Sequence, residues 1–101
     1  MKILILKKEK TLFDIEGDAV FLPSASEKGK FEILNNHCSI ISMISSGIIK
    51  IYSSFFIKKK IYHNNDINIS YNDNTTIIKL KINYGFLNFK KNILTIIYSF
   101  Y

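Results

Sequence analysis

Arginine and tryptophan are absent from this 101-residue chain, and proline and cysteine each occur once. Without arginine there is no planar guanidinium, the group that clamps phosphates and reads guanine edges through paired hydrogen bonds. The single cysteine, Cys38, excludes an internal disulfide and a cysteine-based metal site, and it fits a reducing compartment. The four glycines stand singly at positions 17, 29, 47 and 85, so no glycine-rich phosphate loop is present.

The positive charge comes from lysine alone and amounts to a formal net charge of +6. Because isoleucine and asparagine are also abundant, we interpret this charge as a drift toward AT-rich codons. An alternative stays open, in which a small β-sandwich or barrel binds single-stranded nucleic acid. Its six tyrosines and eight phenylalanines would stack on bases and its lysines would hold the phosphates. The aromatic residues fall mostly within apolar stretches, which favours a place in the core.

Residues suited to catalysis are few. The only histidines are His37 and His63, and neither has an acidic residue at a spacing typical of a metal site or an acid–base pair. Cys38 follows His37 directly, but adjacent residues of a strand point to opposite faces, so we expect Cys38 to be a buried core thiol. The sequence predicts a chain that is not an enzyme and holds no cofactor or metal ion.

Apolar and polar residues alternate with the period of β-strands. Residues 66–71 alternate strictly, and Ile78, Leu80 and Ile82 share one face of a second run. Beyond Gly85 the apolar residues move to odd positions, which predicts a β-bulge at Gly85. Asparagine-rich stretches at 64–65 and 72–74, and the Lys-Lys-Asn stretch at 90–92, separate the runs, as expected for hairpin turns.

One all-β domain follows from these patterns. No segment carries a sustained helical stripe, and a chain of 101 residues supports one core. We therefore predict a small antiparallel β-sandwich of short strands over residues 1–101. The uncharged run at residues 35–49 contains four serines and is shorter than a membrane span, so we expect no transmembrane segment.

Five motifs in order resemble the epsilon subunit family of F-type ATP synthases. Residues 12–13 read Leu-Phe, 20–23 Val-Phe-Leu-Pro, 29–37 Gly-Lys-Phe-Glu-Ile-Leu-Asn-Asn-His and 47–51 Gly-Ile-Ile-Lys-Ile. A weaker match, Tyr-Gly-Phe-Leu-Asn-Phe at 84–89 followed by an apolar run at 93–97, ends the series.

The resemblance implies a non-catalytic rotor subunit in the central stalk, clamped to the gamma subunit and resting on the c-ring, so that proton flow drives ATP synthesis. It implies a peripheral place on the cytoplasmic face of a bacterial inner membrane, or the equivalent organellar face, with no nucleic acid bound and no homo-oligomer in the complex. The implied c-ring contacts are Lys28, Gly29, Lys30, Phe31 and Glu32. The implied gamma contacts are His37, Ser42 and Lys7.

Three features depart from the family pattern. Ser39 stands where the family usually has a proline, and Glu32 replaces a glycine. The stretch from about 52 to 77 is longer than the family requires, which predicts an inserted or extended hairpin. The sequence stops after the last sandwich strand, so we expect no C-terminal helical hairpin and neither self-inhibition nor nucleotide sensing.

Overall fold

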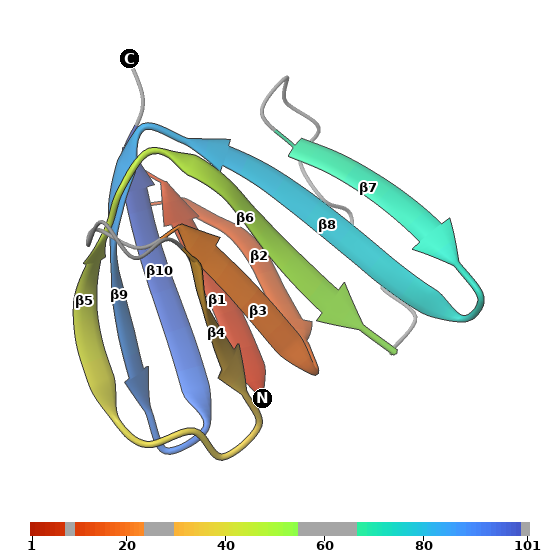
Figure 1. Cartoon of the computed structure of the whole chain (residues 1–101), viewed down its shortest axis with the longest axis horizontal. Helices are drawn as coiled ribbons and strands as arrows, with labels where there is room; N and C mark the ends of the chain where they lie inside the picture. Colours follow the sequence, from red (N-terminus) through yellow and green to blue (C-terminus); the bar gives the residue numbers. More distant parts are fainter. Residues whose placement is uncertain (8–9, 24–29, 55–66, 100–101) are drawn as a thin grey trace.

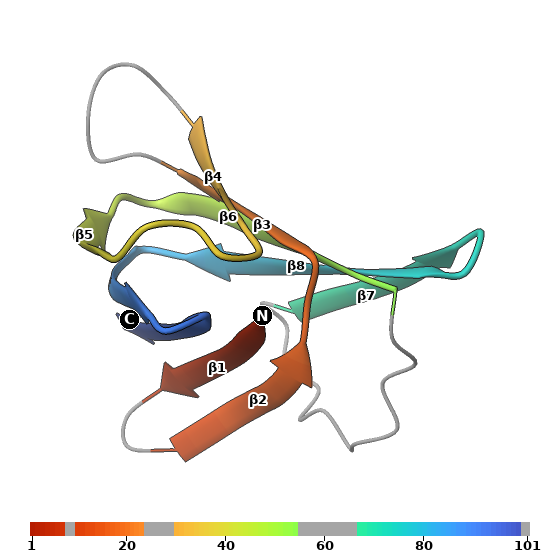
Figure 2. The ribbon, with the colours of Figure 1, turned by 90° about the horizontal axis from the view of Figure 1, so that it is seen from below.

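The computed structural model describes residues 1–7, 10–23, 30–54 and 67–99, and these residues form ten strands and no helix. Two five-stranded sheets pack as the layers of a sandwich (Figures 1 and 2). Sheet A has the order β2 (Lys10–Glu16), β1 (Lys2–Lys7), β10 (Ile93–Ser99), β9 (Tyr84–Lys90), β5 (Ile40–Ile44). Sheet B has the order β4 (Lys30–Leu34), β3 (Ala19–Pro23), β6 (Gly47–Ser53), β8 (Thr75–Ile82), β7 (Ile67–Asn72). The predicted all-β sandwich is confirmed.

One pairing departs from the antiparallel pattern. The first strand, β1, lies parallel to β10, while the other strand pairs of both sheets are antiparallel. Two parallel strands cannot be joined by a tight hairpin, so a long connection is required. Here that connection is almost the whole chain, and it places both ends of the described sequence within sheet A.

The core fills the space between the sheets with aliphatic side chains. Alternate residues of each strand point inward, as the period of two dictates. Ile3 and Ile5 of β1, Ile49 and Ile51 of β6 and Leu94 of β10 have no exposed surface. Because isoleucine is branched at Cβ, it suits the pleated, half-buried environment that these strands provide.

The tight turns use asparagine and its neighbours in left-handed conformations. Asp73 and Asn74 join β7 to β8 with φ of 45° and 67°, and Lys91 and Asn92 join β9 to β10 with φ of 53° and 59°. Two consecutive residues with positive φ match the twist of the flanking strands. The hairpins predicted at 72–74 and 90–92 are confirmed, and the one at 64–65 lies outside the described residues. The predicted extension at about 52–77 is described only in part, where β7 and its turn form the hairpin with β8.

The bulge predicted at Gly85 is wrong. Gly85 pairs with Tyr98 on one side and Ile44 on the other in an unbroken register. The apolar positions shift parity because the chain leaves sheet B at Ile82 and enters sheet A at Tyr84, so the inward direction reverses. A Cβ at Gly85 would lie 3.0 Å from the carbonyl oxygen of Ile97. Close packing therefore requires glycine at this position.

The third family motif, residues 29–37, contributes a strand to sheet B. Residues 30–34 form β4, which pairs with β3 and places Ile33 opposite Val20. Ile33 is fully buried, whereas Leu34 is 47% exposed. The alternation of the segment decides this structure, because its apolar residues need a core that a free loop lacks.

The N-terminal ammonium is held inside the fold. It donates to the carbonyl oxygen of Gly17 at 2.9 Å and to Oδ1 of Asn35, and it lies 3.6 Å from a carboxylate oxygen of Glu16. A buried charge costs much free energy unless such partners surround it. These contacts fix the start of β1 against the end of β2.

Candidate functional site

Exposed apolar side chains, together with the half-buried Leu6, form a continuous row across the outer face of sheet A. Met43 of β5 pairs with Phe86 of β9, which pairs with Ile97 of β10, which pairs with Leu6 of β1. Met43 is 62% exposed, Phe86 46% and Ile97 51%, and Ile41 beside Met43 is 67% exposed. We call these five residues the apolar face. A contiguous apolar patch of this kind is typical of a surface that another protein covers.

The strand at the border of the apolar face is poorly protected as an edge. The described residues pair β5 only with β9, and the sequence of β5 contains neither a charged residue nor proline. Natural proteins usually protect edge strands with lysine, proline or bulges. The other outer strand of sheet A, β2, contains charged residues and pairs with β1 through a register shift. The difference favours β5 as part of a contact surface.

His37 lies between β4 and β5 and is half-buried. Its Nδ1 donates a hydrogen bond to the carbonyl oxygen of Cys38 at 2.7 Å, and its ring packs edge-on against Phe89 with centroids 6.0 Å apart. Cys38 is exposed, and its Sγ lies 3.7 Å from Nδ1 of His37. The prediction of a buried core thiol is wrong. Neither residue belongs to a strand, so the rule that neighbours point apart does not apply.

The other two residues predicted to contact a gamma subunit also lie in sheet A. Ser42, in β5, is half-buried and donates to the carbonyl oxygen of Met43 at 3.0 Å. Lys7 ends β1 and is half-buried. The register places Lys7 beside Tyr98, at the end of sheet A remote from His37. The structure thus brings Ser42 and His37 to one edge of the sheet and leaves Lys7 apart.

The residues predicted to contact a c-ring fall near the start of β4. Lys28 and Gly29 lie outside the described residues, as do the side chains of Lys30 and Phe31. Glu32 is exposed on the outer face of sheet B, opposite Phe21 of β3. Their role as a c-ring contact stays a prediction.

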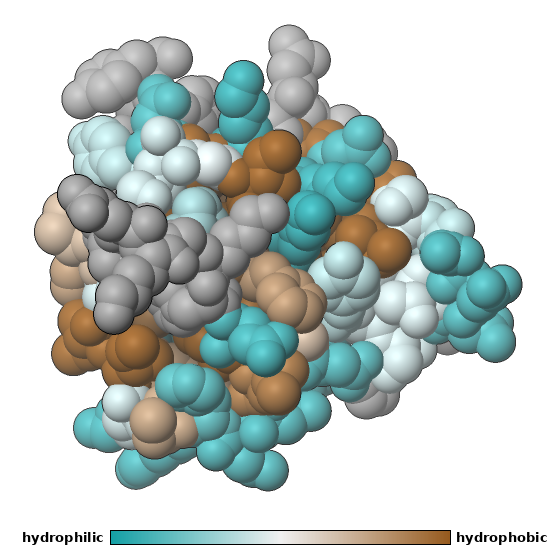
Figure 3. All heavy atoms as spheres, viewed as in Figure 1, coloured by the Kyte–Doolittle hydropathy of each residue, from teal (hydrophilic) through white to brown (hydrophobic). Residues whose placement is uncertain are grey.

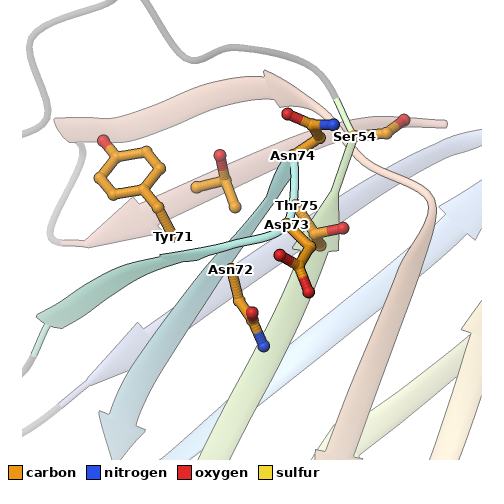
Figure 4. Close-up of a pocket in the computed structure, with 7 residues that line it drawn as sticks. Ser54, Tyr71, Asn72, Asp73, Asn74 and Thr75 are labelled. Carbon is orange, nitrogen blue, oxygen red and sulfur yellow. The ribbon is translucent and has the colours of Figure 1, made fainter.

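A pocket of about 390 Å³ lies at the β7–β8 turn (Figure 4). Hydroxyl and amide groups and one carboxylate line it, from Ser54, Tyr71, Asn72, Asp73, Asn74, Thr75 and Thr76. Asp73 and its turn neighbours are exposed. Within the described ranges no group of three or more metal-ligating side chains is found. Asp73 is the one acidic residue among those that line the pocket, and no histidine, lysine or cysteine lies among them.

The sequence interpretation missed the apolar face. A signal for it was present, since Ile40 and Ile41 are both apolar, as are Ile96 and Ile97. A strand that is apolar on both sides has both faces covered, whereas a strand facing water alternates. Only the assembled sheet shows that these outward residues lie in register with one another.

Comparison with solved structures finds a similar fold in a chain of an ATP synthase structure. A chain in the cryo-EM structure of the central stalk and c-ring of the Tetrahymena thermophila mitochondrial ATP synthase matches with a TM-score of 0.65 and 11% sequence identity. The match covers 98% of this chain and 63% of that chain, so this chain spans less than two thirds of its neighbour's length. At this identity the likeness shows a shared fold.

Comparisons of the sequence itself find no match, either to a protein-family model or to a curated protein. In the part of the chain that the structure describes, no helix has the length and apolar character to cross a membrane.

Proposed function

We propose that this chain is a non-catalytic rotor subunit of a proton-translocating F-type ATP synthase, of the epsilon type. In this role the sandwich binds the gamma subunit and contacts the c-ring, and it transmits ring rotation to gamma. ATP is made elsewhere in the complex. The chain acts at the membrane surface, on the cytoplasmic face in a bacterium or the equivalent face in an organelle.

The apolar face of sheet A carries this proposal. A rotor subunit needs a rigid body with a large contact surface, since it transmits torque without chemistry of its own. The sandwich supplies the rigid body, and Met43, Phe86 and Ile97 supply apolar contact area across three adjacent strands. Apolar residues at the centre of an interface contribute most of its binding free energy.

Two further observations support the assignment. The fold is similar to that of a chain in a central stalk and c-ring structure. The motifs of the epsilon family also occur in order along the sequence.

Co-purification of the tagged full chain with the gamma subunit from the same source tests the proposal. We expect a complex that persists at high ionic strength, because salt screens exposed charges but does not weaken apolar contacts. Retention on nucleic acid in place of gamma, lost as salt is raised, would overturn the proposal in favour of the nucleic-acid alternative.

A further inference from the structure

Three lysines gather in register on the outer face of sheet B. Lys50 of β6 and Lys79 of β8 are direct partners, and Lys81 lies two residues further along β8 on the same side. Lys79 and Lys81 are exposed, and Lys50 is half-buried. We call these three residues the lysine face. Figure 3 looks onto this side of the sandwich, where hydrophilic side chains lie over β6 and β8.

Among the described residues, the direct register neighbours of the lysine face are uncharged, and the acidic side chain in its row, Glu32, lies beyond Phe21, two strands from Lys50. The register neighbours are Phe21 next to Lys50, Asn68 next to Lys79 and Ile48 next to Lys81. Within the described part of the chain, none of the three lysines forms an ion pair. Like charges directly opposite in a sheet lower its stability. Lys50 and Lys79 therefore repel each other, and a negatively charged partner would relieve this repulsion.

We propose that the lysine face binds a carboxylate-rich segment of a second protein, on the side of the sandwich opposite the apolar face. Charge complementarity selects the partner, since three ammonium groups on adjacent strands attract successive carboxylates of an extended chain. Exposed lysine–carboxylate pairs are individually weak and sensitive to salt. Binding is therefore reversible, unlike the association expected at the apolar face.

The aromatic residues favour an acidic protein over nucleic acid as the partner. Binding of single strands depends on exposed rings that stack on the bases. On the outer face of sheet B, Phe21 and Tyr52 are half-buried and pack edge-on against each other, with centroids 5.3 Å apart. The exposed rings of Tyr84 and Phe86 belong to sheet A. Tyr71 of β7 is 67% exposed, but it pairs with the buried Thr76 and so lies on the side of sheet B away from the lysine face. Lysine also acts as a point charge and lacks the fork with which arginine clamps phosphates.

The test measures binding of a fluorescent oligoglutamate peptide to the full chain by anisotropy, at low and at physiological ionic strength. The double variant Lys79→Gln/Lys81→Gln removes two charges from the lysine face. We expect it to weaken binding by between about twofold and thirtyfold, the combined range for two exposed ion pairs. The matched control Lys2→Gln/Lys90→Gln removes two charges from sheet A and should leave the affinity nearly unchanged.

Two outcomes would overturn the proposal. An equal loss of affinity in both double variants would show that net charge alone attracts the peptide. Tighter binding of an oligothymidylate of equal length, with the same dependence on Lys79 and Lys81, would assign the face to nucleic acid. Misfolding of the double variant should not account for a loss of binding, because removing the charge of Lys79 relieves its repulsion with Lys50 and should stabilise the protein. The co-purification with gamma tests a different surface, since these lysines lie outside the apolar face. Failure of one experiment therefore does not imply failure of the other.

Discussion

Lys50 and Lys79 face each other directly across strands β6 and β8, with two positive charges at one register position. Replacing Lys79 by glutamine should raise the free energy of unfolding by about 0.2–1 kcal/mol, because the cross-strand repulsion is removed. Urea denaturation at low ionic strength measures the change. Lys81→Gln serves as control, because Lys81 faces Ile48 and loses no repulsive partner. Unchanged stability of Lys79→Gln would show that the two ammonium groups avoid each other in solution, and lower stability would show that Lys79 stabilises the sheet.

Phe86 lies at the centre of the apolar face, between Met43 and Ile97. Phe86→Ser should weaken the association with gamma by about 1–3 kcal/mol, or roughly fivefold to 150-fold, as for a central interface residue. Quantitative pull-down or interferometry with purified gamma measures this loss. The matched control is Ile48→Ser, which removes a 50% exposed apolar side chain from sheet B. Equal effects of the two substitutions would mean that gamma does not use the apolar face.

Gly85 lies in β9, which pairs with β10 on one side and with β5 on the other. Gly85→Ala should lower the free energy of unfolding by about 1–3 kcal/mol, because its Cβ would lie 3.0 Å from the Ile97 carbonyl oxygen and 3.3 Å from Cβ of Tyr98. The neighbouring atoms belong to a paired central strand and have little freedom to move. Asn88→Ala, at an exposed position of the same strand, should change stability by no more than about 0.5 kcal/mol. Thermal or urea unfolding compares the two variants.

Asn92 combines a left-handed backbone, with φ of 59°, and a side-chain contact in which its Oδ1 accepts a 2.8 Å hydrogen bond from the backbone N–H of Asn36. Asn92→Ala should destabilise the protein by about 1–2 kcal/mol, since it loses both the tolerated conformation and the bond. Asn92→Gly restores the conformation and should recover part of that loss. The unfolding free energies of the two variants separate the two contributions. Equal stability of the Asn92→Ala and wild-type proteins would show that neither the left-handed conformation nor the hydrogen bond contributes to stability.

Much of the fold could be predicted from the sequence, because the strand period and the asparagine-rich turns are local signals. The alternation around Ile78 and Leu80 and the turns at Asp73 and Lys91 depend on neighbours a few residues away. The apolar residues change from even to odd positions at Gly85, and this pattern predicts a bulge. A strand that follows a crossing from one sheet to the other produces the same pattern. Only the pairing partners of that strand distinguish them.

The surfaces could not be predicted, because each is made by residues distant in sequence. Met43, Phe86 and Ile97 become neighbours only through the order of sheet A, and Lys50 meets Lys79 only through the register of β6 with β8. Cys38 shows the opposite error, in which a strand rule was extended into a segment that is not a strand. Local periodicity gives the direction of a side chain, and topology decides which other side chains it joins.

The parallel pairing of β1 with β10 sets an order of events during synthesis of the protein. Ile3 lies beside Leu94 in the finished sheet, so β1 leaves the ribosome long before its central partner exists. Sheet B has no such dependence on β10, since its strands pair by β8 at the latest. Contacts between residues far apart in sequence form slowly, because a long loop must close first. One edge of the apolar strand β1 therefore stays unpaired while the rest of the chain is synthesised. During this interval the exposed edge would be a binding site for a chaperone.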